Sequence, residues 1–495
     1  MKIAQTHGAM IDFDTQVVVV GGGPGGATTA GLLARHGFDV VLLERHSFPR
    51  YHIGESLVPS CLKIFDALGV REKVEKHGFQ QKDGARFDWG GDAWDVGFGT
   101  RLEPQHAWQV VRSEFDRMLL DHAVEQGADV REGVTVTDIA FDGDRPRSVR
   151  FLDWEGAEGV GTFEFLVDAS GRAGLLATRY LRNRRFHEAF RNVALWGYWD
   201  GAGRLADGPL GATASCSIPC GWIWAIPLHD GKLSIGVVMH KSHLRRMRET
   251  QTLAQIYDDA VHENALVKEL ISPGRLVGEL LAETDYSYAS DRFAGSGHFL
   301  VGDAACFLDP LLSTGIHLAT FSGMAAAASI ASILRGEVGE TEAADFFNVS
   351  YRCAYLRLLV VVSLFYQMHT GRDVYFRKAQ ELTTRDFDPG DLRQAFVSVI
   401  SGMEDLNDIQ AGGSQDVLGS LVSFYARHYE FVRGWHRGDA LALTETQAGF
   451  ARMGIAMAAE SEFSLTPETA VNGLYLDAGS SLGLRRVAGA VASSS

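Results

Sequence analysis

The stretch Gln16-Val17-Val18-Val19-Val20-Gly21-Gly22-Gly23-Pro24-Gly25-Gly26 decides the fold of this 495-residue chain. Its four valines form a continuous apolar, β-branched run, which is typical of a strand buried on both faces. After the glycines, residues 27–36 have helical composition and Gly37 supplies a stop. A second apolar run over residues 39–43 ends at Glu44. The order of strand, glycine-rich turn, helix and strand predicts an α/β, Rossmann-like nucleotide-binding module.

The spacing of three glycines gives this turn its predicted chemistry. Gly21, Gly23 and Gly26 match the G-x-G-x-x-G pattern, and an acid follows 18 residues after Gly26. The first glycine allows the tight turn and the second lets the backbone approach a pyrophosphate, while the helix N-terminus offers free N–H groups to negative charge. Glu44 is expected to accept hydrogen bonds from a ribose hydroxyl. The predicted nucleotide-binding residues of this segment are Gly21, Gly23, Pro24, Gly25, Gly26, Glu44 and Arg45.

The chain is acidic, with 46 Lys and Arg against 62 Asp and Glu, which gives a formal net charge of −16. A surface that follows phosphates needs a basic excess or stripe, so this balance argues against a nucleic-acid binder. The five cysteines are sparse and include no C-x-x-C pair, which favours the reducing cytoplasm. No signal peptide is recognised, and the apolar run over residues 316–334 is interpreted as a buried helix rather than a membrane span. The 17 histidines show no metal-binding spacing, so no metal is predicted.

The pattern of the chain changes twice. Strand-like alternation dominates residues 185–285, which predicts an antiparallel β-sheet inserted into the nucleotide-binding module. Beyond residue 340 the pattern is helical and rich in Tyr, Phe and Met. We therefore expect one discontinuous module over residues 14–340, with the inserted sheet on its substrate side. A mainly helical region over residues 341–495 is expected to cap that side.

Later segments point to the identity of the nucleotide. The run Leu300-Val301-Gly302-Asp303 is a buried-strand pattern ending in Gly-Asp, and Pro310 and Ser313-Thr314-Gly315-Ile316 follow it. These segments resemble the Gly-Asp motif of the flavoprotein monooxygenase superfamily, which has the p-hydroxybenzoate hydroxylase fold. Residues 168–172 resemble the Asp-x-x-Gly segment of that superfamily, and Arg112 occupies the place of its flavin-contacting arginine. The resemblance implies FAD, with Arg112, Gly302, Asp303, Pro310, Gly315 and Ile316 as binding residues.

Two further segments narrow the class. Residues 221–227, Gly-Trp-Ile-Trp-Ala-Ile-Pro, match the W-x-W-x-I-P signature of flavin-dependent halogenases, and Lys82 lies where that family keeps its essential lysine. The segment that contains Glu55 and Ser56, which we assign to flavin binding, is also halogenase-like. The chain looks most like the phenolic branch, which includes enzymes that chlorinate tyrosyl groups tethered to carrier proteins during antibiotic assembly. The segment Phe365-Tyr366-Gln367-Met368 fits that branch too.

This resemblance implies that FADH2, O2 and chloride or bromide react to give hypohalous acid. A halide needs an anion site beside the flavin, and backbone N–H groups at the start of a helix provide one. The expected halide-binding residues are Ser313, Thr314 and Gly315. A separate flavin reductase is expected to supply FADH2, since the chain shows no second nucleotide fingerprint.

The resemblance to halogenases also implies a barrier of three residues and one catalytic residue. Trp222, Trp224 and Pro227 are interpreted as a rigid barrier between flavin and substrate, with ordinary strand packing as the alternative. Lys82 is expected either to hold hypohalous acid through an ammonium hydrogen bond or to carry the halogen as a chloramine.

One departure from the family pattern bears on the substrate. Indole-directed halogenases carry a glutamate just before the Ser-Thr-Gly turn, where this chain has Leu312. A phenol is already activated ortho to its hydroxyl, so a fixed carboxylate is less necessary for it. Leu312 therefore favours a phenol over tryptophan. Basic clusters over residues 182–185 and 245–248 are candidate docking sites for an acidic carrier protein, and solvated helix faces are the alternative.

Two other functions stay open at this point. The first is an FAD-dependent aromatic hydroxylase on the same fold, which would reduce its own flavin with NAD(P)H. The second is a reductase of isoprenoid double bonds or a non-catalytic flavin-binding protein, neither of which would need O2 and a halide.

Overall fold

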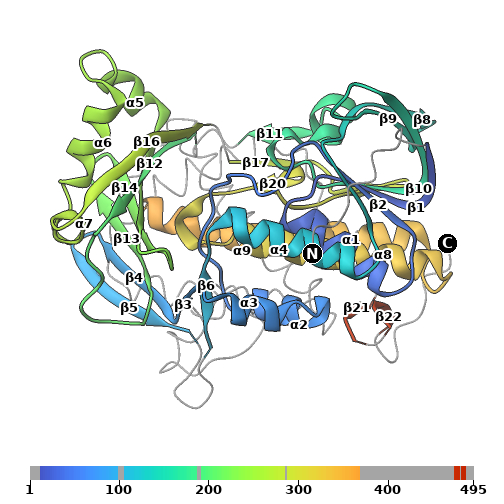
Figure 1. Ribbon diagram of the computed structural model, residues 1–495, viewed down its shortest axis with the longest axis horizontal. Coiled ribbons are helices and arrows are strands. Elements are labelled where there is room, and N and C mark those ends of the chain that lie inside the picture. The colour runs from blue at the N-terminus through green and yellow to red at the C-terminus, as the bar shows by residue number, and fades with distance from the viewer. Residues whose placement is uncertain are drawn as a thin grey trace, which may run out of the picture.

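The computed structural model describes residues 12–98, 105–186, 191–284, 287–367, 473–479 and 481–486. Residues 368–472, which include Met368 and most of the region expected to be helical, lie outside this described part of the chain. Figure 1 shows two large sheets at opposite ends of the molecule, with long helices between them. The candidate functional site lies where the two sheets and the helices meet.

An eight-stranded sheet forms the centre of the nucleotide-binding module. Its path is β18-β19-β10-β1-β2-β7, and β9 joins β10 to β8. β1 pairs in parallel with both β2 and β10, and Val17, Val18 and Val19 are completely buried. The predicted strand with two buried faces is therefore confirmed. The strands are β1 (Phe13–Val20), β2 (Val40–Glu44), β7 (Asp129–Glu132), β8 (Thr135–Asp142), β9 (Arg145–Leu152), β10 (Glu158–Asp168), β18 (Ala294–Gly295) and β19 (His298–Leu300).

The second large sheet has seven strands in the order β16-β12-β15-β14-β13-β4-β5. Its pairs are antiparallel except for β13 with β4, which are parallel. The prediction of an inserted antiparallel sheet is therefore correct for residues 192–284, but the sheet also includes two strands from before the insertion. No hairpin joins β4 to β13, so connectivity does not impose an antiparallel direction on that pair. The strands are β4 (Gly84–Trp89), β5 (Asp92–Gly97), β12 (Asn192–Asp200), β13 (Thr213–Ile218), β14 (Gly221–Pro227), β15 (Leu233–His240) and β16 (Arg275–Thr284).

Helices fill the space between the sheets and cover the outer face of the second one (Figure 1). α1 and α8 approach closely because Gly323 has no side chain. A Cβ atom there would lie only 2.7 Å from the Gly25 carbonyl oxygen. α9 packs along α8. The helices are α1 (Pro24–Arg35), α2 (Ser60–Leu68), α3 (Arg71–His77), α4 (Arg112–Glu125), α5 (Lys241–Met247), α6 (Leu253–Val261), α7 (Ala265–Ile271), α8 (Gly315–Leu334) and α9 (Glu340–Gln367).

α8 is the one helix in the described part of the chain that is long and apolar enough to cross a membrane. However, 94% of its most apolar window is buried inside the protein. Its apolar side chains contribute to the core between α1 and α9, in agreement with the predicted buried helix.

Three small sheets complete the described structure. β3 (Gln80–Lys82) pairs with β6 (Ala107–Gln109), and β17 (Tyr288–Ser290) lies between β11 (Arg184–Phe186) and β20 (Cys306–Phe307). β21 (Leu474–Asp477) and β22 (Gly483–Arg486) form a hairpin in the region that was expected to be mainly helical. The hairpin buries Leu474, Leu476, Leu482 and Leu484, and it packs on the C-terminal half of α8 through hydrogen bonds to Ser332 and Arg335.

Candidate active site

One cavity connects the glycine-rich turn with the start of α8. Its volume is about 570 Å³, which is in the range of small-molecule and cofactor sites. The predicted site residues that line it are Gly21, Gly23, Pro24, Gly25, Glu44, Arg45, Glu55, Ser56, Arg112, Trp224, Gly302, Asp303, Pro310, Ser313, Gly315 and Ile316. The predicted residues outside its lining are Gly26, Lys82, Trp222, Pro227 and Thr314. The fold thus brings the two predicted motifs, almost 300 residues apart, into one cavity.

The glycine-rich turn has the shape that a bound dinucleotide requires. Gly21 has a φ of +111°, and a Cβ atom there would lie 2.2 Å from the Ala169 carbonyl oxygen. A Cβ atom on Gly26 would lie 1.9 Å from the Gly21 carbonyl oxygen. Side chains are therefore excluded from both positions, and the backbone of the turn stays open to the cavity. These residues fit the pyrophosphate of FAD.

Glu44 is fixed at the cavity wall by two backbone N–H groups. Gly22 donates to Oε2 at 2.6 Å and His46 donates to Oε1 at 2.8 Å. Each carboxylate oxygen retains a second lone pair, so Glu44 can still accept a hydrogen bond from a ribose hydroxyl. Its place at the end of β2 is the one that the sequence spacing predicts.

A buried acid and a buried arginine lie farther along the same cavity. Burial raises the pKa of Asp303 to about 6, and the positive charge of Arg112 acts against this shift. Arg112 donates to both carboxylate oxygens of Asp116, at 2.7 and 2.9 Å, and to the Ile53 carbonyl at 2.6 Å. Its guanidinium is therefore held rigidly at the N-terminus of α4. The Asp303 carboxylate can accept hydrogen bonds from hydroxyl groups of a bound ligand, and the Arg112 guanidinium is a fixed cation on the same cavity wall.

Lys82 lies directly behind the cavity wall and is only 2% exposed. Its Nζ donates to Ser56 Oγ at 2.7 Å and to the Leu57 carbonyl oxygen at 3.0 Å. Ser56 lines the cavity and also hydrogen-bonds Thr213 Oγ1 at 3.0 Å. Burial lowers the pKa of Lys82 to about 7. Among the described residues no carboxylate hydrogen-bonds or ion-pairs with this amine, so no carboxylate offsets the effect of burial. At a pKa of about 7, the amine and ammonium forms have similar populations near neutral pH.

A polar network lies near Ser56, with Tyr51, Glu55 and Trp196 at the cavity and Tyr198 behind them. Of these residues only Glu55 was among the site residues predicted from the sequence. Tyr198 donates to Glu55 Oε1 at 2.7 Å, and the Tyr198 and Tyr51 hydroxyls are 3.0 Å apart. Trp196 Nε1 in turn donates to the Tyr51 hydroxyl at 2.7 Å. Burial raises the pKa of Glu55 to about 7. The one available sequence signal was the period-2 spacing of Trp196 and Tyr198, which places both on one face of β12.

The three predicted wall residues have different positions. Trp224 lines the cavity, and Trp222 packs behind it with a centroid separation of 6.1 Å. Trp222 also contacts Trp89, and Trp224 contacts Trp196. Because side chains alternate along a strand, Trp222 and Trp224 share one face of β14 while Pro227 belongs to the other. Trp89, Trp222, Trp224 and Trp196 therefore form a layer of indoles, and Pro227 ends the strand that carries two of them.

The predicted halide site lies at the N-terminus of α8. Ser313 is left-handed, with a φ of +59°, and the buried Thr314 is the N-cap residue. The helix begins at Gly315, so its first turn presents backbone N–H groups that the helix does not use itself. The start of α8 is anchored through His317 Nδ1, which lies 2.8 Å from Ser60 Oγ on α2. This arrangement can bind a small anion beside the cavity.

The comparisons with known proteins agree with this geometry. The family model described as tryptophan halogenase matches residues 16–105 and 101–401. A protein named tryptophan 2-halogenase from Chondromyces crocatus is 44% identical over 406 residues, which is 81% of this chain and 78% of that protein. The flavin-dependent halogenase armH3 of Armillaria mellea is 40% identical over 395 residues, which is 75% of this chain and 78% of the relative.

Solved structures show the same fold. The myxobacterial chondrochloren halogenase CndH, described as a variant of FAD-dependent halogenases, superimposes with a TM-score of 0.68 at 36% identity, over 80% of this chain and 91% of that chain. The flavin-dependent brominase Bmp2 superimposes with a TM-score of 0.69 at 25% identity, over 84% of this chain and all (100%) of that chain. The chain thus belongs to the tryptophan halogenase family and is an FADH2-dependent halogenase, an oxidoreductase with FAD as its cofactor and a halide as its substrate.

Proposed function

We propose that this halogenase chlorinates or brominates an activated phenol in natural-product biosynthesis, such as that of an antibiotic, and that Lys82 delivers the halogen. The observation that carries the proposal is the position of Lys82, with its Nζ fixed by Ser56 and the Leu57 carbonyl just behind the flavin cavity. Bound reduced flavin and O2 supply the oxidising power that converts a halide to hypohalous acid. The chain's own residues bind the halide, confine the acid and present it to the substrate.

We assign each step of the halogen transfer to particular residues. The first turn of α8 holds the halide by its N–H groups, and the indole layer of β14 separates the cavity from the substrate side. Lys82 then reacts as the neutral amine: its lone pair forms an N–X bond, the X–O bond breaks, and hydroxide leaves with an Nζ proton as water. Two Nζ hydrogen bonds fix the amine and leave its lone pair available.

The proposal that Lys82 reacts as a neutral amine predicts how kcat depends on pH. Because burial lowers the pKa to about 7, the fraction of neutral amine is small at pH 6 and large at pH 8. We expect kcat at saturating substrate and FADH2 to rise through pH 7 and then level off. Single-turnover rates from stopped-flow and product quenching measure this profile. If Lys82 instead donates a hydrogen bond as ammonium, kcat falls above pH 7, which contradicts the amine role.

Leu312 is the observation that favours a phenol. It is buried immediately before Ser313, where indole-directed enzymes carry a glutamate. Without a carboxylate there, the proton of an indole arenium ion has no dedicated acceptor at that position, whereas a phenol loses its hydroxyl proton more readily. Tryptophan is the second candidate, because the 44% identical relative is named tryptophan 2-halogenase.

A direct competition separates the two substrates. The enzyme is supplied with a flavin reductase, NADH, FAD, O2 and chloride or bromide, and offered tyrosine, tyrosyl loaded on a carrier protein, simple phenols and tryptophan in equal amounts. We expect mass spectrometry to find the halogen on a phenol at least about tenfold faster than on tryptophan. Faster reaction of tryptophan refutes the phenol proposal. An oxygenated, halide-free product would contradict delivery by Lys82.

The partners follow from the same reaction. Flavin-dependent halogenases generally need a separate flavin reductase, and we propose that this enzyme is cytoplasmic and receives FADH2 from such a reductase. For a carrier-tethered substrate, the docking surface consists of the exposed Arg245 and Arg246 on α5 and Arg248 directly after it. Arg184, from the other basic cluster, is occupied instead, because it donates to the carbonyls of Arg172 and Asp303.

We also propose that the region after residue 340 covers the substrate side. Phe365 of α9 packs on Phe87 and Trp89, with centroid separations of 5.0 and 5.2 Å, and its carbonyl accepts from Trp89 Nε1 at 3.0 Å. Trp89 contacts Trp222. This contact supports a role for α9 in closing the side of the indole layer that faces away from the flavin.

A further inference from the structure

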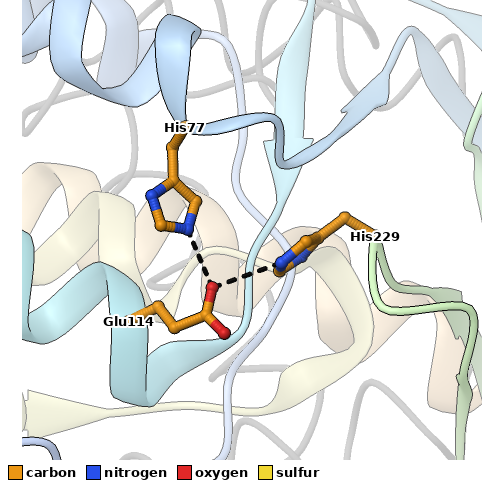
Figure 2. A group of neighbouring side chains, drawn as sticks. All are labelled: His77, Glu114 and His229. Carbon is orange, nitrogen blue, oxygen red and sulfur yellow. Dashed lines mark hydrogen bonds and ion pairs between the residues drawn. The ribbon is translucent and has the colours of Figure 1, made fainter.

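Outside the cavity, three side chains from separate elements converge on one point. His77 ends α3, Glu114 lies in the first turn of α4, and His229 lies in the turn between β14 and β15. Figure 2 shows both imidazole rings pointing at the Glu114 carboxylate. Glu114 Oε2 lies 2.8 Å from His77 Nε2 and 3.2 Å from His229 Nε2. None of the three residues lines the flavin cavity.

This geometry suits a transition-metal ion. One ligand atom from each residue lies within 4.8 Å of the other two. Zinc binds His nitrogen at about 2.0–2.1 Å and carboxylate oxygen at about 2.0–2.2 Å, so tetrahedral ligand atoms are about 3.3 Å apart. The observed separations of 2.8 and 3.2 Å are close to that spacing. Two histidines and one carboxylate are also a ligand set that zinc uses in proteins.

The two rings are held in place by packing. The Phe79 ring stacks on His77 at a centroid separation of 4.0 Å and meets His229 edge-on at 5.3 Å. His229 Nδ1 is buried and has no hydrogen-bond partner among the described residues, so no second hydrogen bond fixes its tautomer. Nε2 can therefore present its lone pair toward Glu114.

We propose that His77, Glu114 and His229 bind a divalent transition metal of the zinc class, with water as the fourth ligand. Each ligand lies close in sequence to a residue of the active site: His77 precedes Lys82 by five residues, Glu114 follows Arg112 by two, and His229 follows Pro227 by two. A bound ion would tie together the segments that carry the lysine, the flavin-side arginine and the indole strand.

The test uses untagged full-length protein, stripped with a chelator and desalted. We expect Zn2+ titration by calorimetry to give one site per chain, and Co2+ to give the intense visible absorption of a tetrahedral site. Zn2+ should also raise the melting temperature. His77→Asn, His229→Asn and Glu114→Gln should each remove the cobalt band and weaken Zn2+ binding by more than the roughly 10- to 100-fold that loss of an outer-shell partner costs.

A matched control distinguishes this site from ordinary surface histidines. His262 is exposed and lies 3.7 Å from Asp258 on α6, so His262→Asn should leave Zn2+ affinity unchanged. Circular dichroism and FAD binding verify that each variant is folded. The proposal is overturned if wild-type protein binds no Zn2+ below millimolar concentration, or if the three variants bind as tightly as the wild type. In that case the cluster is a hydrogen-bonded contact only.

Discussion

Replacing Lys82 with alanine is expected to reduce halogenation by about 10²- to 10⁴-fold, the range typical of a lost proton-transfer or nucleophilic group. The side chain is buried behind Ser56, so no solvent group can take its place. Because Lys82 does not line the cavity, FAD binding should change little. Product formation at saturating FADH2, followed by mass spectrometry, measures the loss, and flavin fluorescence measures FAD affinity.

Lys82→Arg is the informative companion to the alanine variant. Arginine keeps the positive charge and the hydrogen-bond donors, but it stays protonated at any accessible pH. If the neutral amine carries the halogen, the arginine variant should be as inactive as the alanine variant. Substantial activity in Lys82→Arg would show that a cationic donor suffices, and full activity in Lys82→Ala would remove Lys82 from the reaction altogether.

The second large effect is expected for Gly21→Ala. A Cβ atom at this position would lie 2.2 Å from the Ala169 carbonyl oxygen, and the φ of +111° is strained for alanine. Because the obstacle is backbone of the loop after β10, the turn must shift away from the pyrophosphate. The shift weakens backbone hydrogen bonds to the charged pyrophosphate, each worth about 1.5–3 kcal/mol. Since about 1.4 kcal/mol is a factor of ten in affinity, we expect FAD affinity to fall about 10- to 100-fold in fluorescence titrations.

The variant Gly37→Ala separates the effect of the steric clash with Ala169 from the effect of backbone strain. Gly37 also has a positive φ, +83°, but a Cβ atom there would meet nothing within 4 Å. This variant should lose only about 1–2 kcal/mol of stability from backbone strain and keep its FAD affinity. Equal FAD affinity in the Gly21 and Gly37 variants would show that the close approach of the turn to Ala169 does not matter for binding.

The flavin module was predictable because its signals are local. The valine run, the glycine spacing and Glu44 each depend on neighbours in sequence, and the observed helix over Pro24–Arg35 differs from the expected 27–36 mainly at its start. That start was missed because proline and glycine are poor helix formers in general, although proline is favoured in the first turn. The addition of β4 and β5 to the second sheet depends on pairing between distant segments, which alternation cannot show.

The candidate site was predictable only in part, because contacts between distant segments leave no local signal in the sequence. Motif residues such as Gly302 and Ser313 lie in the cavity where their motifs suggested. The contact between Lys82 and Ser56, by contrast, joins two segments of separate motifs, and the Glu55–Tyr198 contact joins a loop to a strand of the inserted sheet. Such pairs follow from tertiary packing and leave no spacing pattern in the chain. The proposed metal site of His77, Glu114 and His229 was not predicted, because these residues come from separate segments and share no spacing pattern.

The indole layer has a consequence for the durability of the enzyme. Hypohalous acid attacks electron-rich rings, and Trp196, Trp222 and Trp224 are themselves such rings. The proposed barrier is thus built from side chains that hypohalous acid can modify. Trp222 and Trp224 are 1% and 4% exposed, and Trp224 Nε1 is held by Ser234 Oγ at 3.3 Å. Close packing shields Trp222, which lies behind Trp224, whereas Trp196 and Trp224 line the cavity and are protected only where they pack on their neighbours. In the proposed role, containment depends on steric protection of these reactive rings rather than on chemical inertness.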